Sequence, residues 1–393
     1  MEDLFYFCFV AAYILYDPPG RKKMFPLVIT RPIADCRLGI LTIREKWEKM
    51  LAVETSTLTA GYLQSLFPQK RETDNYWING GLVPDKYLIQ ALKGLPEDTS
   101  LVSGNHILMS RGRDFPLNTS LNNLIYDRAY QMIDYPWQLF QNNKEALEND
   151  FALCAKEKSL PHLEGVQLIH PENVYIEDGA KVYPATLNAT EGSIFIGKDA
   201  VIMEGSHLRG PVAIGAHAVV KMGARIYGGT TVGPYCMVGG EVKNSILFGY
   251  SNKAHDGYLG DSVIGEWCNL GAGTTCSNLK NTAGKIKIGS REVGLKCGFI
   301  MGDFSRTAVE TRINSGTTIG VSAHLHETGF PLKEVPDFYW NKEEKYQVDK
   351  AIEHAKNWMK LKGKTMNNKM EVVLTRIFNN ELEKKKKVRV SNL

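Results

Sequence analysis

A six-residue repeat in the middle of the chain limits its possible folds more than any other feature. Small residues recur four positions after the repeated aliphatic residue, and glycine often follows that residue directly. An amphipathic helix would repeat at three and four and a simple strand at two, so an interval of six predicts short strands joined by tight turns. The repeated aliphatic residues are Ile196, Ile202, Leu208, Ile214, Val220, Ile226, Val232 and Val238.

Stacked coils of such strands form a solenoid, which needs several coils to bury a continuous core. The pattern begins weakly near Ile176 and resumes as far as Leu325. About nine three-sided coils of about 18 residues fit residues 170–327. The register is interrupted at 245–263 and at 275–287, and we expect loops there, because insertions in solenoids gather on one face that often binds ligands.

The composition is that of an ordinary globular protein. The chain has 393 residues, of which 23% are charged and 43% hydrophobic, so a disordered or collagen-like chain is excluded and two or three domains are expected. No apolar run reaches the roughly 18 residues of a membrane span. The longest, Leu4 to Tyr16, follows two acids and predicts a buried strand rather than a secretion signal. We therefore expect no membrane partner.

Cysteine use and charge distribution narrow the possible settings. Seven scattered cysteines without a Cys-x-x-Cys motif are typical of a reducing compartment, which favours the cytoplasm. The net charge is +4, and residues 341–393 alone hold twelve Lys and two Arg against seven acids. The basic excess therefore lies on a tail that contains Lys384 to Lys387, and not on the folded body that a nucleic-acid enzyme would use.

A polar motif surrounds the first interruption. It contains Lys253-Ala-His255-Asp-Gly-Tyr258-Leu-Gly-Asp261, and Asn269-Leu-Gly-Ala-Gly-Thr and Asn278 follow. Together with the repeat, this motif resembles the acetyltransferase half of the bifunctional N-acetylglucosamine-1-phosphate uridylyltransferase / glucosamine-1-phosphate N-acetyltransferase family. The resemblance implies a left-handed β-helix that uses acetyl-CoA as co-substrate.

The same resemblance implies roles for the motif residues. His255 would be the general base, since imidazole titrates near neutrality and can take a proton from an amine. Tyr258 and Asn269 would orient the amino sugar and its phosphate, and Asn278 would position the nucleophile or the acetyl group. Lys243 and Lys253 are candidates for binding the sugar phosphate. The N–H groups of Gly271, Ala272 and Gly273 are candidates for binding coenzyme A or the developing oxyanion.

A solenoid carbonic anhydrase with three histidine zinc ligands is an alternative, but the other solenoid histidines lack short metal-ligand spacing. They are His170, His207, His217, His324 and His326.

Residues 30–47, in the N-terminal part of the chain, contain several arginine and lysine residues together with glycine and threonine. An expected strand over Phe25–Thr30, a turn with glycine and a helix with cations make a phosphate-binding layout, although the glycine spacing fits neither a Walker nor a dinucleotide motif. The segment is similar to the shortened sugar nucleotidyltransferase head of the same family. By that resemblance the nucleotide-binding residues would be Arg31, Arg37, Gly39, Thr42, Arg44, Lys46, Asn79 and Gly80. Mg²⁺ would bridge the phosphates, with Asp35 as a candidate ligand. The alternative is a head that only binds or packs.

The tail is expected to be helical, with Tyr346, Ile352, Ala355 and Trp358 on one apolar face that caps the end of the solenoid. The expected organisation is an α/β nucleotidyltransferase-like domain over 1–160, a left-handed parallel β-helix over 165–330 and a basic helical tail over 341–393.

The leading functional hypothesis is a bifunctional homotrimeric enzyme that acts on small sugar phosphates and a nucleoside triphosphate. It would acetylate glucosamine 1-phosphate and then join the product to UMP from UTP, giving UDP-N-acetylglucosamine. One alternative is nucleotidyl transfer alone, for example between glucose 1-phosphate and dTTP, with the β-helix serving oligomerisation. A second is an oligomeric scaffold in which both heads have decayed.

Overall fold

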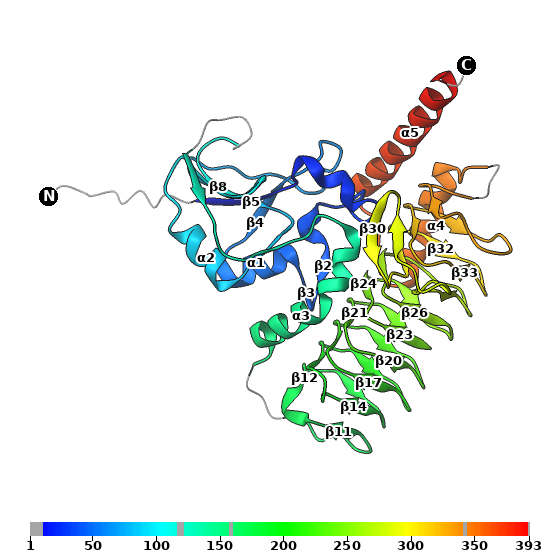
Figure 1. Cartoon of the computed structure of the whole chain (residues 1–393). Helices are drawn as coiled ribbons and strands as arrows, with labels where there is room; N and C mark the ends of the chain where they lie inside the picture. The colour runs from blue at the N-terminus through cyan, green and yellow to red at the C-terminus, as the bar shows by residue number, and fades with distance from the viewer. Residues whose placement is uncertain (1–10, 116–121, 157–159, 341–343, 392–393) are drawn as a thin grey trace. The chain divides into compact units, whose positions relative to one another are not determined.

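The computed structural model describes residues 11–115, 122–156, 160–340 and 344–391, and side chains only as far as residue 380. The chain forms two compact units, which are described separately (Figure 1). The first unit comprises residues 1–22, 31–36 and 42–134, and the second comprises residues 23–30, 37–41 and 135–393. The second unit therefore contains two short segments from the N-terminal part of the sequence.

The second unit is built on a left-handed parallel β-helix with three faces of parallel strands. The first face contains β11 (Gln167–Ile169), β14 (Thr186–Asn188), β17 (His207–Arg209), β20 (Arg225–Ile226), β23 (Glu241–Lys243) and β26 (Tyr258–Gly260). The second contains β12 (Val174–Ile176), β15 (Ile194–Ile196), β18 (Val212–Ile214), β21 (Thr230–Val232), β24 (Ile246–Gly249), β27 (Val263–Glu266), β31 (Phe299–Met301), β34 (Thr317–Ile319) and β36 (Glu334–Val335). The third contains β13 (Lys181–Val182), β16 (Val201–Ile202), β19 (Val219–Val220), β22 (Met237–Val238) and β25 (Asn252–Lys253), and the pair β32 (Arg306–Thr307) and β35 (His324–Leu325) continues it.

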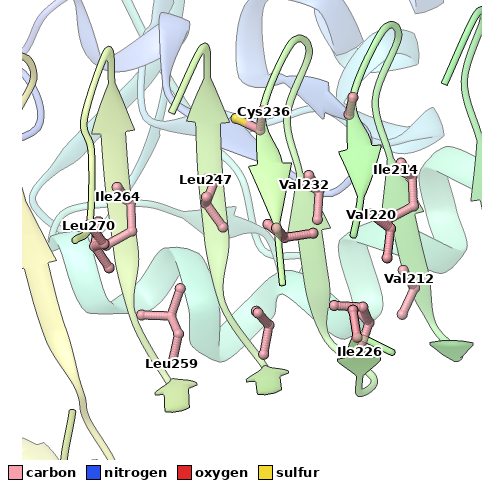
Figure 2. Packing of buried hydrophobic residues seen from close by; sticks show 14 of the residues in the cluster. Val212, Ile214, Val220, Ile226, Val232, Cys236, Leu247, Leu259, Ile264 and Leu270 are labelled. Carbon is pink, nitrogen blue, oxygen red and sulfur yellow. The ribbon is translucent and has the colours of Figure 1, made fainter. Parts of the chain in front are cut away.

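The core of the β-helix confirms the predicted repeat. All eight aliphatic residues of the repeat are at most 1% exposed. They lie in columns because strands of successive coils pair in register. Figure 2 shows four of them, Ile214, Val220, Ile226 and Val232, inside the β-helix. Ile214 pairs with Val232 on the second face, and Val220 pairs with Val238 on the third. An interval of six thus places the repeated aliphatic side chain of each strand in the interior.

The two interruptions of the repeat have different causes. The first was expected to be a loop, but the β-helix runs through it: Val232 pairs with Leu247 and Leu247 with Ile264, steps of 15 and 17 residues. The coils are shortened at their corners, which shifts the repeat without inserting a loop. The second interruption is an insertion, since Val263 pairs with Ile300, and it contains the hairpin β29 (Ile286–Ile288) and β30 (Arg291–Gly294).

Close stacking of the coils depends on glycine at Gly233. A Cβ atom there would lie 1.9 Å from the Phe248 carbonyl oxygen, which is backbone of the next coil and cannot move aside cheaply. We expect Gly233→Ala to lower the free energy of unfolding by about 3 kcal/mol, the cost of forced overpacking. Urea denaturation monitored by circular dichroism measures this loss. Gly284→Ala is the matched control, since its nearest neighbour would be 3.4 Å away, and an equal loss in both variants would contradict the argument.

Helix α3 (Pro136–Cys154) covers part of the second face. Leu147 of this helix packs with Phe195 and Ala213 of the β-helix. The Asn143 amide donates to the Gly229 carbonyl over 2.8 Å and to the Thr231 hydroxyl over 3.0 Å. Hydrogen bonds as well as apolar contacts therefore fix the helix on the sheet.

The tail forms α4 (Val348–Leu361) and α5 (Asn368–Ser391), as expected. On the predicted apolar face, Tyr346, Ile352 and Ala355 are buried, and the Trp358 ring lies 5.2 Å from the Arg306 guanidinium of the third face. The Lys362 ammonium donates to the Tyr235 carbonyl over 2.5 Å and to Asn252 Oδ1 over 2.9 Å. The helix therefore covers the C-terminal coils of the third face. The side chains of Lys384 to Lys387 lie outside the described residues.

Packing of the tail makes the second unit sensitive to acid. Burial, and then the charges of Arg306 and His354, lower the pKa of His324 to about 3. The pKa of a histidine in an unfolded chain is about 6.5. Between these values the unfolded chain binds a proton that the folded chain does not, so stability falls as the pH drops through this window. We expect the melting temperature of His324→Gln to fall less than that of the wild type between pH 7.5 and pH 5. The exposed His207→Gln serves as control, and equal acid sensitivity of all three proteins would contradict this prediction.

The first unit contains a six-stranded mixed sheet in the order β4-β1-β5-β8-β7-β9. Its strands are β1 (Ala12–Tyr16), β4 (Thr55–Leu58), β5 (Asn75–Asn79), β7 (Thr99–Ser103), β8 (His106–Arg111) and β9 (Asn122–Ile125), and its helices are α1 (Ile43–Leu51) and α2 (Lys86–Lys93). β1 lies between β4 and β5, which confirms the C-terminal part of the predicted strand over Leu4–Tyr16. Residues 1–10 lie outside the described residues.

The predicted strand over Phe25–Thr30 is wrong. This segment of the second unit forms turns, in which the Leu27 N–H donates to the Met24 carbonyl and the Ile29 N–H to the Pro26 carbonyl. Pro26 has no N–H to donate to a sheet, which favours turns over a paired strand. None of the described helices is long and apolar enough to cross a membrane.

Candidate functional site

His255 lies at an edge of the β-helix, in the four-residue corner 254–257 between β25 of the third face and β26 of the first. The side chain is exposed. The corner is held closely between the corners of the coils on either side: a Cβ on Gly240 would lie 2.9 Å from the His255 carbonyl oxygen, and the Gly273 N–H donates to the Asp256 carbonyl over 3.2 Å. A fixed backbone thus presents a solvent-accessible imidazole, which is the arrangement a general base requires.

Tyr258, at the start of β26, belongs to a hydrogen-bonded network that includes Asn278. The Asn278 amide nitrogen donates to the Tyr258 hydroxyl over 3.0 Å and to Asp261 Oδ2 over 2.5 Å. Asn244 donates to the other carboxylate oxygen, Asp261 Oδ1, over 2.6 Å. Asp261 is only 5% exposed, so two amides satisfy a buried carboxylate. The structure thus brings Tyr258 and Asn278 together, as their shared predicted site requires.

The carboxylate sets the direction of these hydrogen bonds. An ionised carboxylate only accepts, so Asn278 must turn its N–H₂ group toward Asp261, and its amide oxygen is the group left to accept from elsewhere. The Tyr258 hydroxyl accepts from the same N–H₂ group, and its own proton can be donated to a ligand. Burial, and then the charge of Asp261, raise the pKa of Tyr258, so the phenol stays neutral at physiological pH. Tyr258 is therefore a donor and not a base.

Asp261 and Asn244 were not assigned roles from the sequence. Asp261 follows Leu-Gly in the motif of the first interruption, and its place in that motif is what could have pointed to it in the sequence. Asn244 stands at a corner with φ of 46°, a left-handed conformation that asparagine adopts more readily than most residues. Its contact with Asp261 depends on the register of two coils, which no local motif encodes.

Asn269 lies on the third face and outside this network. Its Oδ1 accepts from the Asn252 amide over 3.3 Å, and Asn252 in turn accepts from Lys362 of the tail. His255 therefore lies at the edge, with Tyr258 on one of the two faces that meet there and Asn269 on the other. These three predicted catalytic residues therefore lie along one outward-facing, convex edge of the β-helix of a single chain.

The residues predicted to contact the sugar phosphate and coenzyme A differ in how accessible they are to a ligand. Lys243 is exposed, with its ammonium 5.8 Å from the centre of the Tyr227 ring. Lys253 is only 2% exposed, so the prediction that it contacts a sugar phosphate does not fit its position. The Gly271 N–H donates to the Thr307 hydroxyl and the Gly273 N–H to the Asp256 carbonyl, and both are thereby engaged inside the β-helix. Ala272 is the remaining member of that predicted turn.

In the first unit, the predicted nucleotide-binding cations make internal contacts. Arg44 forms a two-pronged ion pair with Asp35, over 2.7 and 2.9 Å, and also donates to the hydroxyls of Thr55 and Thr57. Arg31 and Lys46 are buried. This arrangement does not form the open phosphate-binding site that the sequence predicted.

The other predicted head residues support the backbone. Thr42 caps α1 through a capping box with Glu45. Asn79 accepts from the Gly81 N–H and donates to the Ile107 carbonyl, and the Gly80 N–H donates to the Tyr16 carbonyl. Each of these polar groups therefore has a structural partner in the first unit.

Arg37 and Gly39 belong to the second unit. Arg37 donates to the carbonyls of Phe248 and Ile40 over 3.0 and 2.5 Å. Gly39 is buried, with its N–H on Asn143 and a hypothetical Cβ 2.7 Å from the Ala146 carbonyl oxygen. The glycine permits close packing on α3 and does not form a phosphate-binding turn.

The described residues do not fit a protein site for Mg²⁺. The Asp35 carboxylate is occupied by Arg44, and in the described ranges no three His, Cys, Asp or Glu side chains are grouped to hold a metal ion. Magnesium commonly binds through one or two carboxylates together with substrate phosphates, so phosphate ligands would have to supply most of the coordination.

Comparisons with known proteins find relatives of this chain. Residues 13–159 match the family model described as sugar nucleotidyl transferase. The chain is 28% identical over 237 residues to a bifunctional sugar-1-phosphate nucleotidylyltransferase/acetyltransferase of Sulfurisphaera tokodaii, a match that covers 56% of this chain and 53% of the relative. It is 38% identical over 84 residues to the bifunctional protein GlmU of Methanocaldococcus jannaschii, covering 20% and 21% of the two chains.

The matched region thus spans about half the length of the first relative and about a fifth of the second. A solved UDP-N-acetylglucosamine acyltransferase is 14% identical with a TM-score of 0.22, over 45% of this chain and 69% of that one, which is too low to support an argument. Residues 13–159 are therefore similar to the sugar nucleotidyl transferase family. The resemblance of the chain to the bifunctional nucleotidylyltransferase/acetyltransferase proteins is confirmed.

Proposed function

We propose that the β-helix is an N-acetyltransferase that acetylates the 2-amino group of glucosamine 1-phosphate with acetyl-CoA. The observation that carries this proposal is the exposed His255 beside the network of Tyr258, Asn278 and Asp261. The relative from Sulfurisphaera tokodaii, whose name includes acetyltransferase, supports the reaction class.

In this reaction the sugar amine attacks the thioester carbonyl of acetyl-CoA. A C–N bond forms while the C–S bond breaks, and coenzyme A leaves as a thiolate that takes up a proton. His255 accepts the proton that the amine must lose to become a nucleophile. The Tyr258 hydroxyl donates to a sugar or phosphate oxygen, and the Asn278 amide oxygen accepts from the amine.

We propose that the enzyme is a homotrimer in which a neighbouring β-helix completes the site. Small-molecule sites are concave, whereas His255 lies on a convex edge, so a second copy is needed to supply the facing wall. Sedimentation measurements test the assembly.

The experiment that tests acetyl transfer measures free thiol released from acetyl-CoA by the full chain. We expect release with glucosamine 1-phosphate and little with N-acetylglucosamine 1-phosphate, whose amine is already blocked. Glucosamine without phosphate is the second comparison, and a lower rate with it would indicate that the phosphate is bound. If the folded protein releases no thiol with any amino sugar, the proposal fails.

Nucleotidyl transfer by the N-terminal part of the chain is a second candidate function, because residues 13–159 match the sugar nucleotidyl transferase model. The proposed reaction joins N-acetylglucosamine 1-phosphate to UMP from UTP with Mg²⁺, giving UDP-N-acetylglucosamine and pyrophosphate. Pyrophosphate release tests it, with UTP and N-acetylglucosamine 1-phosphate compared with dTTP and glucose 1-phosphate. Because Arg44 and Asp35 form an ion pair with each other, an N-terminal part that no longer catalyses is the favoured alternative. In that case no nucleoside triphosphate would give pyrophosphate.

A further inference from the structure

A lysine occupies an interior position of the β-helix where the repeat otherwise places an aliphatic residue. On the third face, Lys253 of β25 pairs with Val238 of β22, and the preceding residues of this column are Val182, Ile202 and Val220. Lys253 is only 2% exposed. An unpaired ammonium in such a core is very costly, so its position depends on the groups that it binds.

The Lys253 ammonium binds two backbone carbonyl groups. It donates to the Gly239 carbonyl over 3.1 Å and to the carbonyl of His255 itself. Burial lowers the pKa of Lys253 to about 8, and the nearby carboxylate of Asp256 opposes that effect, as does the Cys276 thiol, while Arg225 adds to it. The group therefore remains largely charged at neutral pH, and its hydrogen bonds are charge-assisted.

Two other corners of the same edge are closed by a backbone hydrogen bond across the corner. In corner 221–224 the Ala224 N–H donates to the Lys221 carbonyl over 3.2 Å, and in corner 271–274 the Thr274 N–H donates to the Gly271 carbonyl over 3.0 Å. Across the described stretch 254–257 the corresponding backbone bond does not form. The lysine therefore adds a contact from inside the β-helix to those that the neighbouring coils make with the corner that bears His255.

We propose that Lys253 is a positioning residue that fixes the His255 corner through its hydrogen bond to the His255 carbonyl, and so aims the imidazole at the substrate amine. This inference rests on the proposed acetyl transfer. With the carbonyl directed into the core, the side chain of residue 255 is left to project outward, in agreement with its exposure. Misplacement of a catalytic group by about 1 Å can cost as much as about a hundredfold in rate.

The test is Lys253→Met in the full chain, because methionine fills a similar volume without the ammonium. We expect the melting temperature to be unchanged or raised, since a charge leaves the core. We expect kcat for acetyl transfer to fall between about tenfold and a hundredfold while KM for acetyl-CoA changes less than about twofold. Amide hydrogen exchange in residues 255–258 should become faster than in the wild type.

Lys181→Met is the matched control, because Lys181 lies on the same face with an exposed side chain and should change neither quantity. Hydrogen exchange requires no substrate, so it tests the positioning even if the proposed acetyl transfer is wrong. Unchanged exchange at 255–258 together with wild-type kcat in Lys253→Met would overturn the inference. A lowered melting temperature with proportional losses in every readout would also overturn it, because the lysine would then support only the fold.

Discussion

Replacing His255 with alanine is expected to lower kcat for acetyl transfer by about a thousandfold, within the range of a lost general base. The side chain is exposed on a corner whose backbone is held by the coils on both sides, so the fold should not depend on the imidazole. The measurement is thiol release from acetyl-CoA with saturating glucosamine 1-phosphate. The melting temperature is expected to stay within about 1 °C, as for surface substitutions.

The matched control is His207→Ala, which removes an exposed histidine from the first face of an earlier coil and should retain wild-type activity. A second check raises the pH of the assay. More amine is then already deprotonated, so the deficit of His255→Ala should shrink at alkaline pH. A variant that keeps more than about a tenth of wild-type kcat at neutral pH would contradict the role of His255 as base.

The solenoid could be predicted from the sequence because every sixth residue of the repeat is an aliphatic residue that faces the interior. Ile196 to Val238 are held to that interval by the core itself, so the periodicity reports burial directly. The same logic fails after Val238, where the corners shorten. There the aliphatic spacing changes, a lysine takes an interior position, and a continuous β-helix resembles an insertion in the sequence.

The site could be predicted only in part, for a related reason. Tyr258 and Asn278 could be selected from the sequence because the local motif contains them. The hydrogen bonds that Asn278 donates to Tyr258 and to Asp261 depend on which residues of successive coils lie side by side, and that is decided by coil length. In the first unit a cation-rich segment suggested phosphate binding. Arg44 instead pairs with Asp35, nine positions earlier, and sequence alone does not show whether a cation will bind a ligand or a neighbouring carboxylate.

Asp261→Asn is expected to reverse the hydrogen bonds around Tyr258. An asparagine has one N–H₂ group, which must face either Asn244 or Asn278, and both of these present N–H₂ groups to the native carboxylate. One amide must therefore turn over. If Asn278 turns, its oxygen faces Tyr258, the phenol donates to that oxygen, and neither group presents the native pattern to the substrate.

We expect kcat/KM for glucosamine 1-phosphate to fall by about a hundredfold in Asp261→Asn, the cost of roughly 3 kcal/mol when a buried polar group meets the wrong partner. Removal of the carboxylate should also lower the Tyr258 pKa, because the charge of Asp261 contributes to its raised value. An ultraviolet titration of tyrosinate, with Tyr258→Phe as reference, measures that change. Asp199→Asn is the control, since it alters a half-exposed corner aspartate of an earlier coil. If Asp261→Asn keeps wild-type kcat/KM, Asp261 does not set the hydrogen-bond directions of the site.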